Sequence, residues 1–153
     1  MKKSETTVTE PIATNPAVVS ESGCFMVANS GHATYCSMVP KTPEERKFLF
    51  NAVNSPALSL RDFINKTINV RDVFAEECTF LDKQTGAISE GVRIVLIDAE
   101  GASYSTCSRG VFSGLSKLFA LYGTPDHWTE PVPILIKQIT KSPTQAVLVF
   151  EIA

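Results

Sequence analysis

The sequence predicts a mainly β fold with two helices, in which five strands form a small barrel. Three observations predict it. Runs rich in β-branched and aromatic residues fill most of the chain after residue 67, as expected of strands. One amphipathic helix, residues 108–123, interrupts these runs. A second helix is expected within residues 41–56, ahead of the strands.

Length and composition indicate one domain. The 153 residues are 44% hydrophobic and 20% charged, a balance that supports a buried core. We expect a flexible N-terminal arm at residues 1–22 and a domain at 23–153, divided into a hairpin-helix extension (23–60) and a barrel (61–153). No apolar run approaches the roughly 20 residues of a membrane span, so we expect no membrane partner and a cytoplasmic location.

The extension begins with a predicted hairpin formed by CFMVAN and ATYCSMV. The helix that follows has a clear start. Thr42 and Glu45 have the spacing of a capping box, and Pro43 suits the first helical position. The sequence therefore predicts a helix that ends near Asn54.

The barrel strands follow in chain order. They are expected at residues 67–80, 92–98, 102–107, 131–140 and 144–152. The first is long, and its alternation breaks at Asp72 and Val73, which predicts a bend or bulge. Residues 81–91 are expected to form a polar hairpin loop around Gly86.

The helix at 108–123 has signals at both ends. Ser108 is a good N-cap and Gly123 suits the closing left-handed residue. Apolar side chains recur on one face, at Val111, Phe112, Leu115, Leu118, Phe119 and Tyr122. Gly110 and Gly114 weaken a helix, so we expect another backbone to approach them closely, either a packed strand or a ligand.

The order strand, strand, strand, helix, strand, strand is that of the five-stranded OB-type barrel, with the helix between barrel strands 3 and 4. In that fold the second and third strands, with the loops after the first and fourth strands, bind oligonucleotides or oligosaccharides. Fold alone does not decide function, and a net charge of −2 gives no support for nucleic acid.

A single strand requires cations for its phosphates and flat rings for its bases. The candidate binding residues on or near the expected face are Arg71, Lys83, Arg93, Tyr104, Arg109, Trp128, Lys137 and Lys141. The alternatives are solvated surface charges for the cations, core for Tyr104, and a cover over one barrel end for Trp128. Phe74 or Phe80 is a further candidate for stacking, whereas Phe112 and Phe119 are expected in the core.

Catalytic and metal-binding signals are lacking. The chain has two histidines, far apart, and no nucleophile motif or phosphate-binding glycine loop, so we expect no enzyme. Cys24, His32 and Cys36 match no zinc spacing, so we expect no metal and no cofactor.

Residues 34–152 resemble the single-stranded DNA-binding proteins of tailed bacteriophages and mobile elements of Gram-positive hosts. The resemblance lies in KFLFNAVNSPALSLRDFINKTINVRDVFAEE, RIVLIDAEGASYSTCSRGVFSGLSKLFALYG and PDHWTEPVPILIKQIT. It implies binding of single-stranded DNA without sequence preference, in viral replication or recombination, with no cofactor. Self-association and replication proteins are further partners left open. The alternative function is a small barrel that mediates protein interaction or assembly without binding nucleic acid.

Overall fold

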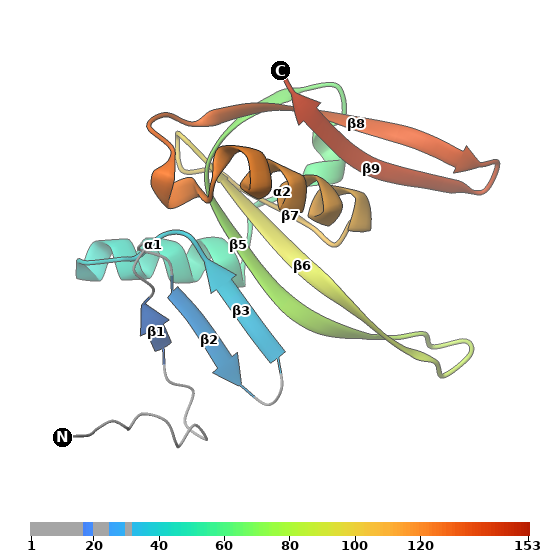
Figure 1. Cartoon of the computed structure of the whole chain (residues 1–153). Coiled ribbons are helices and arrows are strands. Elements are labelled where there is room, and N and C mark those ends of the chain that lie inside the picture. Colours follow the sequence, from blue (N-terminus) through green and yellow to red (C-terminus); the bar gives the residue numbers. More distant parts are fainter. Residues whose placement is uncertain (1–16, 20–24, 30–31) are drawn as a thin grey trace.

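The computed structural model describes residues 17–19, 25–29 and 32–153, which form one sheet and two α-helices (Figure 1). Within these ranges the sheet has nine strands: β1 (Ala17–Val19), β2 (Phe25–Asn29), β3 (His32–Cys36), β4 (Leu58–Ser59), β5 (Thr67–Leu81), β6 (Ile88–Asp98), β7 (Ser103–Thr106), β8 (Val132–Ser142) and β9 (Gln145–Ile152). The helices are α1 (Pro43–Asn54) and α2 (Arg109–Tyr122), with short 3-10 helices η3 (Leu60–Phe63) and η4 (Pro125–His127). None of these helices has the length and apolar character needed to cross a membrane. The predicted mainly β fold with two helices is confirmed.

Strand β5 organises the sheet because it has three partners. It pairs with β6 over most of its length, with β8 at residues 67–70 and with β3 at residues 74–76. A register shift between Val70 and Asp72 separates the last two regions. The predicted bend is therefore confirmed at the residues where the alternation breaks.

Five strands curl into a half-barrel in the spatial order β9-β8-β5-β6-β7. Their chain order, with α2 between β7 and β8, is the predicted one. In the described part of the chain, however, no backbone pairing joins β7 to β9. The two residues of β4 pair in parallel with β7, Leu58 lying opposite Tyr104. The expected closed barrel of five strands is thus not confirmed, because a segment that precedes β5 occupies the edge of β7.

The sheet has a hydrophobic cluster on each face. Strand β6 contributes to both, since successive side chains of a strand point to opposite faces. Ile94 and Leu96 belong to the larger cluster, inside the half-barrel and under α2. Val95 and Ile97 belong to the smaller cluster, under α1. The direction of a β6 side chain therefore decides whether it faces α2 or α1.

Helix α2 lies against β9, as its glycines predict. A Cβ atom at Gly110 would collide with the carbonyl oxygen of Leu148, and one at Gly114 would lie 2.7 Å from the ring of Phe150. The packed-strand interpretation of both glycines is confirmed. The predicted caps are present, with Ser108 accepting from the backbone N–H of Val111 and Gly123 at a φ of 78°.

The predicted apolar face of α2 is correct for Val111, Leu115 and Leu118, which are buried. It is wrong for Tyr122, whose ring is 51% exposed. Tyr122 is the last residue of the helix, and it lines an open pocket with His127 and Trp128.

Helix α1 also starts as predicted. The Thr42 hydroxyl accepts from the backbone N–H of Glu45 (3.1 Å), while the Glu45 carboxylate accepts from the backbone N–H of Lys41 (2.7 Å). Leu49 and Ala52 are buried against the sheet.

The predicted N-terminal hairpin is present as β2 and β3, which pair antiparallel. Strand β1 pairs with β2 and falls inside the segment 1–22 that we expected to be a flexible arm, whose other residues lie outside the described part of the chain. The predicted loop at residues 81–91 is shorter, because pairing of β5 with β6 extends to Leu81 and Ile88.

Candidate functional site

The hairpins β5–β6 and β8–β9 extend from the half-barrel to the same side, and α2 begins between their bases (Figure 1). In the first hairpin every residue from 79 to 90 is exposed. Lys83 lies in its turn and Lys141 lies near the turn of the second hairpin, both exposed. Two of the predicted cations therefore occupy the hairpin ends on one side of the molecule.

The turn that carries Lys83 is held by Asp82. The Asp82 carboxylate accepts from the backbone N–H of Gln84 (2.8 Å) and of Thr85 (3.3 Å). These two bonds lower the pKa of Asp82 because they stabilise its charged form. Gly86 closes the turn with a φ of 73°, a conformation that favours glycine. The position of Lys83 is thus defined by a preformed turn.

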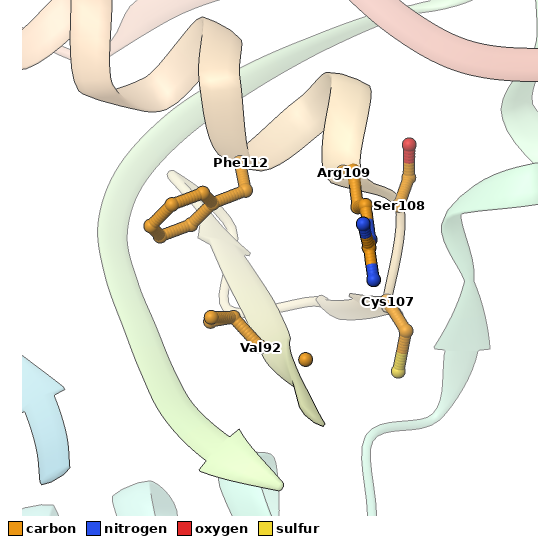
Figure 2. A pocket seen from close by; sticks show the side chains of 6 residues that line it. Val92, Cys107, Ser108, Arg109 and Phe112 are labelled. Atoms are coloured by element: carbon orange, nitrogen blue, oxygen red, sulfur yellow. The ribbon is translucent and has the colours of Figure 1, made fainter. Parts of the chain in front are cut away.

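A pocket of about 240 Å³ lies between β6 and the start of α2. Its lining consists of Gly91, Val92, Cys107, Ser108, Arg109 and Phe112. Figure 2 shows the ring of Phe112 and the side chain of Arg109 extending from α2 toward β6, on either side of the pocket. Phe112 is 44% exposed and Arg109 is also exposed. We call these six residues the α2-start pocket.

The start of α2 is fixed by Ser108. Its hydroxyl donates to the carbonyl oxygen of Leu148 on β9 (2.7 Å) while it caps the helix. Ser108 therefore holds the first turn of α2, and with it Arg109, at a defined position beside β9.

Arg109 and the N-terminus of α2 both place positive charge here, although the net charge of the chain is −2. Helix N-termini carry partial positive charge, and no acidic residue lies in the first turn of α2. No ion pair engages Arg109 within the residues that the structure describes. An anion such as a phosphate is favoured here.

Phe80 extends the aromatic surface from the neighbouring strand β5. Its ring is 41% exposed and lies so close to Gly91 that a Cβ atom there would be 2.7 Å from a ring carbon. Phe80 and Phe112 therefore both adjoin Gly91. Of the two alternatives in β5, Phe74 is buried and Phe80 is the exposed one.

The prediction that Phe112 belongs to the core is wrong, whereas the same prediction for Phe119 is correct. Both rings lie on the same edge of α2. Tyr35 and Trp128 pack on Phe119, with ring centroids 5.9 Å and 6.3 Å away. The spacing of apolar residues along α2 predicted that this edge is apolar. It did not indicate that the side chain of Phe112, in the first turn, is exposed.

Three of the predicted cations form ion pairs: Arg71, Lys137 and Arg93. Arg71 binds the largely buried carboxylate of Asp72 (2.9 Å) from the surface, and Lys137 binds Glu151 (3.4 Å) in an exposed pair. An exposed pair contributes about 0–1 kcal/mol, so Lys137 can exchange partners.

Arg93 is held more firmly, away from the α2-start pocket. It pairs with Glu76 (2.9 Å) and donates to the carbonyl oxygen of Val53 at the end of α1. By the alternation of β6, Arg93 lies on the α1 face of the sheet with Val95. Its parity along β6 therefore places it on a different face of the sheet from Arg109 and Phe112.

Tyr104 is a core residue in this structure rather than an exposed stacking platform. Its side chain is 6% exposed, packs edge-on against Phe63 and donates to Asp98 (2.8 Å). Burial, with the nearby Asp98 carboxylate, raises the pKa of Tyr104 to about 12. The buried hydroxyl is satisfied by this bond and the ring is closed to a base.

Trp128 lies at the other end of α2 from Arg109. Its indole Nε1 donates to the carbonyl oxygen of Gly123 (2.9 Å), and its ring packs on Phe119. One edge lines a second pocket of about 380 Å³ with Tyr122, His127 and Ile152. The predicted site residues are therefore not a single surface: Arg109 lies in the pocket between the two hairpins, and Trp128 packs on the core at the far end of the helix.

Metal ligands do not gather in the described part of the chain. No group of three or more His, Cys, Asp or Glu side chains there could hold a metal ion. Cys24 and the side chain of His32, two of the residues whose spacing we compared with zinc sites, lie outside it. The side chains of the α2-start pocket are instead apolar, hydroxyl, thiol and guanidinium groups.

Comparison with known proteins agrees with the resemblance noted in the sequence. A model of the family described as phage single-stranded DNA-binding protein matches residues 30–153. No curated protein and no solved structure gives a match. The family is one of binding proteins rather than enzymes. Because the matched segment covers well over half of the sequence, the chain belongs to the family of phage single-stranded DNA-binding proteins.

Proposed function

We propose that this protein binds single-stranded DNA without sequence preference and protects it during phage DNA replication or recombination, in the cytoplasm of the host cell. Membership of the family supports the binding of single-stranded DNA. The observation that carries the proposal is the α2-start pocket, where Arg109, which has no ion pair among the described residues, lies beside the half-exposed ring of Phe112. A phosphate and a base are the two groups that such a pair can bind.

The arrangement of the strands supports this placement. We interpret β5 to β9 as an OB-type barrel left open between β7 and β9. Its binding face then includes β6, β7 and the ends of hairpins β5–β6 and β8–β9. The α2-start pocket lies against β6 beside the end of β7, and Lys83 and Lys141 lie near the two hairpin ends. A strand crossing between the hairpins meets all three cations.

The chemistry of the rings supports binding without sequence preference. Phe80 and Phe112 have no hydrogen-bonding groups, so they cannot distinguish one base edge from another. Stacking tolerates any base because every base has a π-face. The phosphates that Arg109, Lys83 and Lys141 would bind are also the same at every position.

A salt titration tests the proposal. The affinity of the intact protein for a fluorescent oligo(dT) is measured by anisotropy at several salt concentrations, with a duplex of equal length as control. We expect tight binding of the single strand at low salt and weaker binding of the duplex. The logarithm of affinity should fall linearly with the logarithm of salt concentration, by about 0.7 per phosphate contact. Absent binding at low salt would contradict the proposal and favour the alternative function in protein assembly.

A further inference from the structure

The solvent-facing side of helix α1 carries an exposed aromatic residue next to two cations. The exposed side chains away from its core residues include Glu44, Arg46, Lys47, Phe50, Asn51 and Asn54. Positions three and four apart share one side of a helix, so Arg46, Lys47 and Phe50 lie together. Leu49 and Ala52, on the other side, pack against the sheet. We call Arg46, Lys47 and Phe50 the α1 patch.

Phe50 is largely exposed. Its side chain is 63% exposed, which makes it the most exposed aromatic residue among those the structure describes. A single exposed apolar side chain is common and needs no explanation. Phe50 differs because two cations lie one turn before it on the same side of the helix. A ring beside cations is the combination by which proteins hold single-stranded nucleic acid through stacking and phosphate contacts.

The two cations are available for a ligand. Neither Arg46 nor Lys47 forms an ion pair within the described part of the chain. The nearest acidic residues along the helix are Glu44 and Glu45, and the Glu45 carboxylate accepts from the backbone of Lys41 at the start of the helix. The α1 patch thus holds two positive charges beside an exposed ring, with Glu44 one turn before Lys47, and its cations and ring are the groups that bind a flexible polyanion carrying flat bases.

The end of α1 is bonded to β6 on the face of the sheet opposite α2. The guanidinium of Arg93 bonds to the carbonyl oxygen of Val53, and Arg93 follows directly after Gly91 and Val92 on β6. Both Gly91 and Val92 line the pocket. Phe50 lies three residues before Val53, about 4.5 Å along the helix axis. A strand longer than the pocket reaches the α1 patch only by passing Arg93 onto the α1 face of the sheet.

From these observations we propose that the α1 patch is a second contact for single-stranded DNA, used by strands longer than the α2-start pocket holds. The inference rests on the proposed function. Phe50 stacks one base, and Arg46 and Lys47 bind neighbouring phosphates. The strand thus passes from the α2 face of the sheet to the α1 face. One protein molecule then covers more nucleotides than the pocket alone would cover.

The experiment compares oligonucleotide lengths. The affinities of the intact chain and of the triple variant R46Q/K47Q/F50S are measured for oligo(dT) of about 5 and about 20 nucleotides, lengths that bracket much of the range of about 4–16 nucleotides per OB fold. For the long strand we expect the variant to bind about tenfold more weakly. Its salt slope should be smaller by about 1.4, which is two phosphate contacts. For the short strand we expect no change.

The matched control is Glu44→Gln, which changes a charge on the same helix and should not weaken either affinity. Circular dichroism establishes that the variants keep their fold, as expected for exposed positions. Equal loss for both lengths, or no loss for either, would overturn the inference. An altered oligomeric state without length-dependent affinity would also overturn it, because the patch would then bind a second copy of the chain. If the unmodified protein binds neither length, it is the proposed function that fails.

Discussion

The two ends of helix α2 carry similar side chains in opposite situations. At its start, Phe112 is half exposed beside Arg109, in a pocket between two hairpins. At its end, Phe119 is covered by Tyr35 and Trp128. The difference shows that the type of ring does not decide its role. An aromatic ring is available for a ligand where no other segment packs on it, and here that place also holds an unpaired cation.

The largest effect is expected at the closed end. Replacing Trp128 by Ala removes the ring that packs on Phe119 and the bond to Gly123, which should lower the free energy of unfolding by about 3 kcal/mol. Urea denaturation measures this loss. We expect the affinity for oligo(dT) to change little under conditions where the variant is folded. If the Trp128 variant instead lost affinity for oligo(dT) and kept its free energy of unfolding, the end of α2 with Trp128 would be the binding end, contrary to the proposal.

An intermediate effect is expected at the open end. Replacing Phe112 by Ala should weaken binding of oligo(dT) by about 1–3 kcal/mol, because one stacked base loses its ring. The free energy of unfolding should fall by less than about 1 kcal/mol, since the ring is 44% exposed. Phe112→Tyr keeps a flat ring and is the matched control, expected to bind like the unmodified protein. If the Ala and Tyr variants bind equally well, Phe112 does not stack a base.

The smallest effect is expected for the cation at the open end. Arg109→Gln should weaken binding by about 1 kcal/mol and reduce the salt slope by about 0.7, the share of one phosphate. Arg71→Gln is the comparison, because Arg71 is paired with Asp72 and lies outside the α2-start pocket. Anisotropy titrations at several salt concentrations measure both slopes. An unchanged slope for the Arg109 variant would show that this side chain binds no phosphate.

Local signals predicted much of the fold. The caps of α1 and α2, the close approach at Gly110 and the bend of β5 all depend on a few neighbouring residues, and the structure confirms each. The order of strands around α2 also followed from the sequence. The closed barrel did not, because the pairing of β4 with β7 joins residues nearly 50 positions apart and leaves no local pattern.

The candidate site was predicted only in part. Chain order places Arg109 at the start of α2 and Lys83 and Lys141 near the ends of the two hairpins, as the structure shows. The burial of Tyr104 and the position of Arg93 on the α1 face could not be predicted, since the face on which a strand residue lies depends on register and on which helix covers that face. Phe112 was missed because its exposure depends on the absence of a covering segment near the start of α2.

The most direct test of where the strand lies is photo-crosslinking of the intact protein to oligo(dT) that contains 5-iodouracil, with mapping of the crosslinked residues by mass spectrometry. A base stacked on a ring crosslinks to that ring. We predict crosslinks at Phe112 and Phe80, beside Gly91. Crosslinks confined to Tyr122 and Trp128 would contradict the account, because they would place the DNA at the other end of α2.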